Sequence, residues 1–513
     1  MSIFQKRSVF DLSHDRKFSC DMGKLVPILC EEVLPGDTFK VKTDLVLRLA
    51  PMLAPMMHRV DVFTHYFYVP TRILHDNWEN FITGGKNGQD ATPVPIVRSP
   101  AGGFSPGSLW DYFGLPTGIG NLEVLAYPFR AYALIYNDWY RDQNLQDPVG
   151  LSLADGLDET TNLLLLNRNW EKDYFTSALP WPQRGDSPML PLAGSEAPVS
   201  GNLPGRPVIF EAQTANNVYQ ARTMNPSFNS PYTMVANGAG DVGRAGRFRS
   251  ENAALPEGNL IADLSEAGSV SINDLRLAFQ VQRWMERSAR GGARLVETIL
   301  SHFGVRSSDA RLQRPEYLGG GKSPLVISEV LQTSSTDATS PQGNMAGHGF
   351  SAHRSHEFNK SFEEHGYVIG LVSIMPRTAY QQGLPRQWNR RSRYDWYWPA
   401  FAHLGEQAVL NKEIYAQGTS SDLEVFGYQG RYDEYRRRES TVHGDFRTSL
   451  DFWHMGRIFA SPPALNSQFV TADPTKRISA VTDDHNCWVQ LLNQVQAIRP
   501  LPKRGVPGFI DQN

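Results

Sequence analysis

The feature that most constrains this chain is a run near its start in which larger residues stand at every second position. The run ends before Pro51, and its members are Phe39, Val41, Thr43, Leu45, Leu47 and Leu49. A period of two is typical of a β-strand with one buried face. Because a slip of one residue would turn the whole set toward solvent, we predict one strand over 37–49 with its apolar side chains inward.

Four more segments are dense in β-branched and aromatic residues, and they lie far apart in the sequence. These segments are 60–69, 367–375, 446–455 and 487–495. If strands so distant are neighbours in a sheet, long excursions must join them, which favours a β-sandwich with elaborate loops over a simple meander. The 513 residues correspond to roughly three domains, or to one large domain with insertions.

Three segments have apolar residues at helical spacing. The first covers 128–140 and begins at Pro128, a residue that suits the first turn of a helix. The second covers 271–291 and begins with a capping box at Ser271. The third is a short helix over 293–303. We therefore expect few helices in a chain that is mainly β.

The stretch 201–268 differs from the rest in composition, because it holds no lysine and many Gly, Pro, Asn and Ser residues. No period of a helix or strand persists in it, and so long an irregular loop is usually functional or flexible. We expect an insertion that is ordered where copies meet around a symmetry axis, since ordering it alone costs roughly 1–2 kcal/mol per residue of backbone entropy. The candidates for that shared contact are Val208, Ile209, Phe210, Tyr219, Phe228, Tyr232, Met234 and Val235.

Charge and cysteine content exclude several classes of protein. With 50 basic and 53 acidic residues the formal charge is −3, which excludes a uniformly basic nucleic-acid coat and an acidic tail protein. Cys20, Cys30 and Cys487 are odd in number and lack metal-site spacing, which is typical of a reducing compartment. No signal peptide and no run of ~18 apolar residues is found, so we expect a soluble protein made in the cytoplasm.

Two glycine-rich motifs resemble nucleotide-binding sites, but the residues around them do not fit such sites. The G-x-G-x-x-G match at 238–243 has no convincing strand before it and no helix after it, as a dinucleotide site requires. The GGGKS run at 319–323 lacks the first glycine of a phosphate loop, and Pro324 blocks the helix that would hold the phosphate. We expect a turn at 319–323 and no cofactor.

Four histidines lie close together in the sequence, and a metal cluster is conceivable. They are His348, His353, His356 and His365. The segment is rich in Gly and Ser, no cysteine joins it, and Lys360 stands where a zinc-protease motif has its second histidine. We predict no metal site and no catalytic residue.

Two segments, 385–398 and 430–438, interleave arginines with aromatic residues. Guanidinium groups neutralise phosphates while aromatic faces stack on unpaired bases, as single-stranded nucleic acid requires. Packing between subunits is an equally good interpretation, because arginine and aromatic residues also dominate protein interfaces, and Asp433 and Glu434 are placed to pair the nearby arginines. The candidate DNA contacts are Arg390, Arg391, Arg393, Arg431, Tyr432, Tyr435, Arg436, Arg437 and Arg438.

Taken together, several segments resemble one family, the major capsid proteins of small single-stranded DNA phages in the gokushovirus branch of the microviruses. The matching segments, in the order that the family has them, are 10–39, 64–81, 128–145, 272–292, 309–320 and 427–447. The resemblance covers most of the chain except 201–268. It implies a viral jelly roll, an eight-stranded antiparallel β-sandwich of two four-stranded sheets, with 1–200 and 269–513 as its core.

The resemblance also implies a function, that of a major capsid protein that assembles into a small icosahedral shell around a circular single-stranded DNA genome. Its implied partners are further copies of the chain, that DNA, the phage's internal scaffolding, pilot and small DNA-binding proteins, and a receptor on the host cell. In this family the loop at 201–268 builds protrusions at threefold axes, so we expect it to face outward and touch the host. The implied location is the virion, after assembly in the bacterial cytoplasm. The alternative is a soluble single-stranded nucleic-acid-binding protein or an enzyme.

Overall fold

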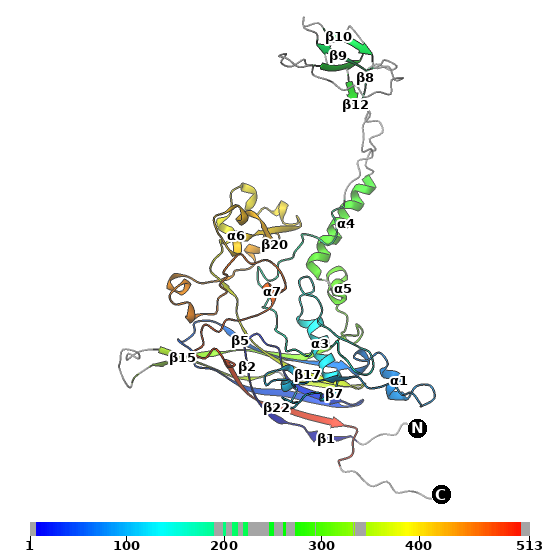
Figure 1. Ribbon diagram of the computed structural model, residues 1–513, viewed down its shortest axis with the longest axis vertical. Coiled ribbons are helices and arrows are strands. Elements are labelled where there is room, and N and C mark those ends of the chain that lie inside the picture. The colour runs from blue at the N-terminus through cyan, green and yellow to red at the C-terminus, as the bar shows by residue number, and fades with distance from the viewer. Residues whose placement is uncertain are drawn as a thin grey trace. The chain divides into compact units, whose positions relative to one another are not determined.

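In the computed structural model, the chain divides into two compact units, residues 1–184 with 286–513, and residues 185–285 (Figure 1). The structure describes side chains in residues 7–188, 272–292, 294–331, 333, 345–355 and 357–503. It describes the backbone alone in residues 199–201, 208–213, 219–223, 246–250 and 260–262.

The first unit contains a sandwich of two antiparallel sheets. One sheet has the strand order β13-β5-β17-β3, and these strands are β13 (Glu316–Pro324), β5 (Val60–Pro70), β17 (Gly366–Pro376) and β3 (Val26–Val33). The other has the order β1-β22-β4-β15-β14, with β2 also paired to β22 and β16 to β4. Its strands are β1 (Ser8–Asp11), β2 (His14–Cys20), β4 (Thr38–Leu49), β14 (Val326–Leu331), β15 (Met345–Arg354), β16 (Phe358–Ser361) and β22 (Cys487–Arg499).

The order of the strands along the chain is that of a jelly roll. The chain changes sheet between β2 and β3, between β3 and β4, and between β4 and β5, and the last strand, β22, lies between β2 and β4. This alternation is how a jelly roll winds its two sheets together, so the predicted fold is confirmed. In the described part of the chain one sheet has the expected four strands and the other has seven, because β1, β14 and β16 extend it.

Most predicted elements are confirmed. The strands expected at 37–49, 60–69, 367–375 and 487–495 are β4, β5, β17 and β22. The expected helices are α3 (Tyr127–Ile135), which continues as a π-helical turn (Tyr136–Tyr140), α4 (Ile272–Gly291) and α5 (Leu295–Phe303). The cap predicted at Ser271 lies outside the described residues.

The described part of the chain also contains short α-helices and strands, with several 3₁₀ turns besides. The short helices are α1 (Trp78–Thr83), α2 (Leu109–Tyr112), α6 (Asn411–Ile414) and α7 (Ser467–Val470). The short strands are β6 (Ile96–Arg98), β7 (Glu123–Leu125), β18 (Ala379–Tyr380), β19 (Glu406–Leu410), β20 (Val425–Gly430) and β21 (Ser440–Thr441).

Two local predictions are wrong. The strand expected at 446–455 is a pair of 3₁₀ turns, because the backbone N–H groups of Thr448 and Leu450 both donate to the carbonyl oxygen of Asp445, and local turns override the β-propensity of the aromatic residues. The turn expected at 319–323 is part of β13. Its glycines serve close packing within the sheet, since a Cβ added at Gly320 would lie 2.1 Å from the carbonyl oxygen of Thr64.

The expectation that 201–268 lacks regular structure is also wrong. The second unit contains β8 (Val199–Gly201), β9 (Val208–Gln213), β10 (Tyr219–Thr223), β11 (Gly246–Ser250) and β12 (Leu260–Ala262). They pair as a sheet of order β10-β9-β11 and as the two-stranded sheet β12-β8. Strands of three to six residues are too short for their period to stand out in the sequence. The glycine motif at 238–243 lies outside the described residues.

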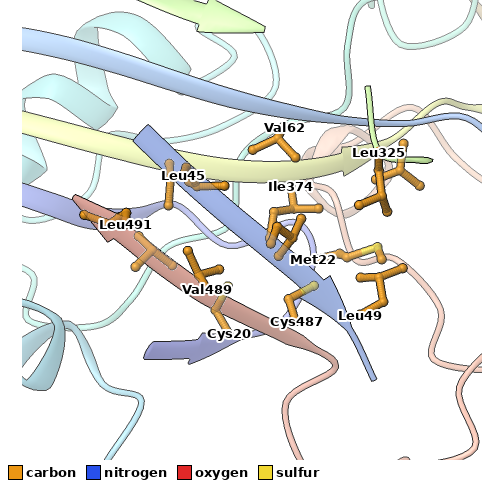
Figure 2. Close-up of a cluster of buried hydrophobic side chains, with 14 of the residues drawn as sticks. Cys20, Met22, Leu45, Leu49, Val62, Leu325, Ile374, Cys487, Val489 and Leu491 are labelled. Carbon is orange, nitrogen blue, oxygen red and sulfur yellow. The ribbon is translucent and has the colours of Figure 1, made fainter. Parts of the chain in front are cut away.

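The core lies between the two sheets of the first unit. Figure 2 shows Leu45 and Val489 of one sheet near Val62 and Ile374 of the other, and all are buried. The alternation of β4 places Phe39, Val41, Leu45 and Leu47 in this interior, which confirms the predicted register.

A buried polar chain crosses the same interior. The Thr43 hydroxyl donates to Asn493 Oδ1 at 2.8 Å, and the Tyr66 hydroxyl donates to Thr43 Oγ1 at 2.5 Å. Asn493 also donates to the carbonyl oxygen of Ile28 at 2.8 Å. Thr43 and Asn493 belong to one sheet and Tyr66 and Ile28 to the other, so these bonds fix how the two sheets align.

One long excursion is held by a buried arginine. Arg130 on α3 donates to Asp158 at 2.8 Å and to the carbonyl oxygens of Leu74 and Ala154, and neither charged side chain is exposed to solvent. Burial acts to raise the pKa of Asp158, but hydrogen bonds from Thr161 and Arg130 outweigh it and hold the pKa below its ordinary value. The pair therefore fastens the loop after α3 to the sandwich.

The register of β4 predicts that alanine substitution at two neighbouring residues has very different effects on stability. Leu47 is fully buried and Val46 is 39% exposed. We expect Leu47→Ala to lower the free energy of unfolding by about 2–5 kcal/mol, because it leaves a cavity between the sheets. Val46→Ala, the control, should change it by no more than about 0.5 kcal/mol. Urea denaturation of the purified chain measures both, and equal effects would contradict the register.

Candidate functional site

The two segments rich in arginine and aromatic residues lie side by side. The backbone N–H of Trp398 donates to the Tyr432 hydroxyl at 3.3 Å, and that hydroxyl donates to the carbonyl oxygen of Trp396 at 3.2 Å. The Arg390 guanidinium lies 4.7 Å from the ring centroid of Tyr435. Residues 385–404 and 430–438 thus form one surface, which we call the basic–aromatic surface.

The surface is built on a small hairpin and an aromatic cluster. Strands β19 and β20 pair antiparallel, and Phe426 of β20 is buried in one cluster with Phe175 and Tyr380. The chain leaves β20 at Tyr432, whose φ of 65° is left-handed and turns the backbone sharply. The Tyr432 side chain is only 4% exposed, so of the two predicted base-stacking tyrosines it is Tyr435 that reaches the surface.

Large aromatic side chains stand out from this surface. Six of them are between 49% and 65% exposed, and they are Trp388, Tyr394, Trp396, Tyr397, Trp398 and Tyr435. A patch of this kind on a single subunit marks an interaction site. The exposed patch fits both interpretations made from the sequence, which are contact with DNA and packing against another subunit.

Acidic side chains neutralise about half of the predicted DNA-contact arginines. Asp433 lies 3.7 Å from Arg436 and 3.2 Å from Arg437, and Glu434 lies 3.8 Å from Arg390. Among the described residues, four predicted arginines form no ion pair. They are Arg391, Arg393, Arg431 and Arg438. The free positive charge of the surface is therefore smaller than its sequence indicates.

A cavity of about 520 Å³ opens among these charges. Arginines from both segments line it together with Glu413 of α6, Glu434 and Glu439. Burial raises the pKa of Glu439 to about 7, and the nearby charge of Asp173 adds to the rise. Protonation of Glu439 near neutral pH thus makes the cavity more positive. Sequence reasoning missed Glu413 and Glu439, because only the fold brings them to the arginines.

The family model described as "Capsid protein (F protein)" matches residues 2–509. The chain belongs to this capsid protein family.

Three relatives named Capsid protein VP1 extend this likeness over nearly the full length. The capsid protein is 41% identical to that of Bdellovibrio phage phiMH2K, over 99% of this chain and 96% of the relative. It is 41% identical to that of Chlamydia phage 1, over 98% and 96%, and 35% identical to that of Spiroplasma virus 4, over 98% and 95%. The predicted resemblance to gokushovirus major capsid proteins is confirmed, and the alternative of a nucleic-acid-binding protein or enzyme is not favoured.

Two of the histidines singled out in the sequence lie on β15, and His365 packs edge-on against Trp78 of α1. His348 is exposed on β15, while His353 on the same strand lies 3.5 Å from the Thr64 hydroxyl, and His356 lies outside the described residues. In the described part of the chain, no three His, Cys, Asp or Glu side chains gather as ligands for a metal ion. None of the helices described there has the length and hydropathy of a membrane span.

The predicted DNA contacts of the capsid protein can be tested by how strongly its affinity for DNA depends on salt. Arg431, Arg436, Arg437 and Arg438 are replaced together by alanine. Removing one phosphate contact lowers the slope of log affinity against log salt by about 0.7–1. Because Asp433 already pairs two of the four, we expect a total fall of at most about two. Fluorescence anisotropy of a single-stranded oligonucleotide across a salt series measures it.

Arg98→Ala is the control for that experiment. Arg98 is half exposed and forms a surface pair with Glu123 on β7, away from the basic–aromatic surface. If the fourfold variant and the control have the same slope as the unaltered protein, the four arginines serve protein contacts instead.

Proposed function

We propose that this capsid protein assembles into a small icosahedral shell that encloses a circular single-stranded DNA genome. The observation that carries the proposal is a jelly-roll sandwich in a chain that matches capsid proteins from residue 2 to residue 509. A flat, rigid sandwich can tile a closed surface, while its long loops supply the contacts between tiles. Assembly into shells of uniform size, seen by sedimentation and electron microscopy, tests the proposal.

For the basic–aromatic surface we favour a contact with a neighbouring subunit. Its exposed aromatic side chains supply the apolar area that anchors a protein interface. Half of its eight arginines are paired with Asp433, Glu434 or Glu413, which suits a protein partner better than a polyanion. DNA contact at this surface stays a prediction, and the salt series described above decides between the two.

Removal of two tryptophans tests the subunit contact. Trp388 is 65% exposed, and Trp396 is about half exposed. Since a buried aromatic anchor is worth about 2 kcal/mol or more at an interface, we expect Trp388→Ala with Trp396→Ala to leave small oligomers where the unaltered chain forms shells. The melting temperature of the subunit should stay unchanged, because neither ring is part of the core.

Ile119→Ala is the matched control, since Ile119 is 49% exposed in the loop between α2 and β7. The control should form shells normally. If the double tryptophan variant also assembles at the concentration that the unaltered protein needs, the surface is no subunit contact.

We further propose that the insertion over 201–268 projects outward and contacts the host cell. Val208, Ile209 and Phe210 lie on β9 and Tyr219 on β10, whereas the other four contact candidates lie outside the described residues. The entry and exit of the insertion pair with each other, with Gly201 opposite Leu260 in the β8–β12 ladder. Residues 202–259 therefore leave and return at one place.

This pairing shows where the insertion can be removed with little change to the rest of the chain. We expect replacement of 202–259 by two glycines to leave the jelly roll and shell assembly intact, because Gly201 and Leu260 are neighbours across a ladder. Attachment to the bacterial host should be abolished. Particles counted by their DNA content and mixed with host cells give the adsorption rate, and a normal rate would refute the receptor role.

A further inference from the structure

One outer face of the sandwich is covered by helices, and the other is exposed. The outer face of the β5–β17 sheet is covered, since Trp110, Phe129 and Tyr132 from α2 and α3 pack on Phe67 and Ile369. Strands β5 and β17 are accordingly buried on both sides almost throughout. Strands β4 and β22 instead alternate between buried and exposed residues along their length. Their outward side chains, with those of β1, β2 and β15, form an exposed surface that we call the outer sheet face.

Three residues on neighbouring strands form a row across the outer sheet face, with an arginine between two aromatic residues. Arg48 on β4 is the ladder partner of Trp488 on β22 and of Phe350 on β15. Trp488 is 48% exposed and Phe350 is 39% exposed. Partners across a ladder point to the same face, and neighbouring strands lie about 4.8 Å apart. The backbones of the two aromatic residues therefore lie about 10 Å apart, on either side of the strand that carries Arg48.

The outer sheet face is positive although the chain as a whole is negative. Its basic residues are Lys17, Lys40, Lys42, Arg48 and Arg354, and its acidic residues are Asp11, Asp15 and Asp44. Five positive against three negative charges leave a net +2, against −3 for the whole chain.

A smaller share of these cations is paired than in the basic–aromatic surface, where four of the eight arginines have an acidic partner. Asp44 pairs with Arg354 at 2.5 Å, and among the described residues Lys17, Lys40, Lys42 and Arg48 have no ion-pair partner. The amides of Gln490 and Gln496 alternate with buried residues along β22 and add donors and acceptors to the same face. Free cations, exposed rings and amides on a flat sheet together match phosphates, bases and base edges.

We propose that the outer sheet face is the surface along which this protein contacts single-stranded DNA. The inference rests on the proposed function and assigns the contact to a surface that includes none of the nine arginines and tyrosines predicted from the sequence. Figure 1 shows β20 and α6, which carry the basic–aromatic surface, on one side of the sandwich, and β22 and β1 on the other. A shell wall one subunit thick turns only one of these sides to its interior. Four of the five cations on the sheet side are unpaired, against four of the eight arginines on the basic–aromatic surface, and this difference in proportion favours the sheet side.

Two variants separate stacking from charge. Trp488→Ala with Phe350→Ala removes both rings and leaves every charge in place. Because stacking is worth about 1–3 kcal/mol per base, we expect single-stranded binding by the purified protein to weaken at least about tenfold. Lys17→Ala, Lys40→Ala, Lys42→Ala and Arg48→Ala together should lower the salt slope by about 0.7 for each phosphate that is no longer neutralised, and by at most about three in total. A poly(dT) oligonucleotide and a duplex of equal length are the two probes.

Phe303→Ala is the matched control, because Phe303 at the end of α5 is 77% exposed and lies on neither surface. The control should bind both probes as the unaltered protein does. In the unaltered protein we expect tighter binding to the single strand than to the duplex, since only unpaired bases can stack.

The outcomes also separate this inference from the function on which it rests. If the unaltered chain forms no shells, the proposed function fails, while the oligonucleotide measurements still test the sheet. If both sheet variants bind the single strand as tightly as the control does, the inference is overturned. It is equally overturned if the sheet variants keep DNA binding but no longer assemble into shells, because the face would then be an interface between protein chains. Equal affinity for single strand and duplex would overturn the stacking part.

Discussion

The pairing of β22 with β4 is the interaction on which the rest of the structure depends. It joins the last strand of the chain to an early one, from Cys487 opposite Leu49 to Ile498 opposite Thr38. With β2 on its other side, β22 is an interior strand, so the sheet is complete only when the end of the chain arrives. The connections between the strands of the sandwich then become loops with fixed ends. Because the entropy of loop closure grows slowly with length, such a frame tolerates very long excursions.

The frame leaves two unlike outer faces. One sheet receives α2 and α3 and a loop fastened by the buried pair of Arg130 and Asp158, so its strands become apolar on both sides. The other sheet stays bare and keeps the strict alternation of a half-buried strand. The polar chain through Thr43, Asn493 and Tyr66 holds the sheets in alignment, which keeps the side chains of the bare face at fixed spacings.

Arginine content alone does not identify a surface that binds DNA. In the basic–aromatic surface the arginines are close together in sequence. Asp433 pairs two of them locally, and the fold brings Glu413 and Glu434 to two more. In the outer sheet face the cations are scattered through the sequence, yet the ladder aligns them beside two exposed rings without acidic partners for most of them. Each surface holds four unpaired cations, so what distinguishes the two is the share that is paired, one of five on the outer sheet face and four of eight on the basic–aromatic surface.

The sequence by itself determined the long elements, because their periods are properties of consecutive residues. Strand β4 and helix α3 follow from alternation and from helical spacing, and motifs in family order identified the capsid fold. Only the tertiary structure decided that 319–323 is a strand, where packing against Thr64 requires glycine, and that turns replace the strand expected at 446–455. It alone brought Arg48, Phe350 and Trp488 into one row. Such a row has no local pattern, since strand pairing couples residues that are hundreds of positions apart.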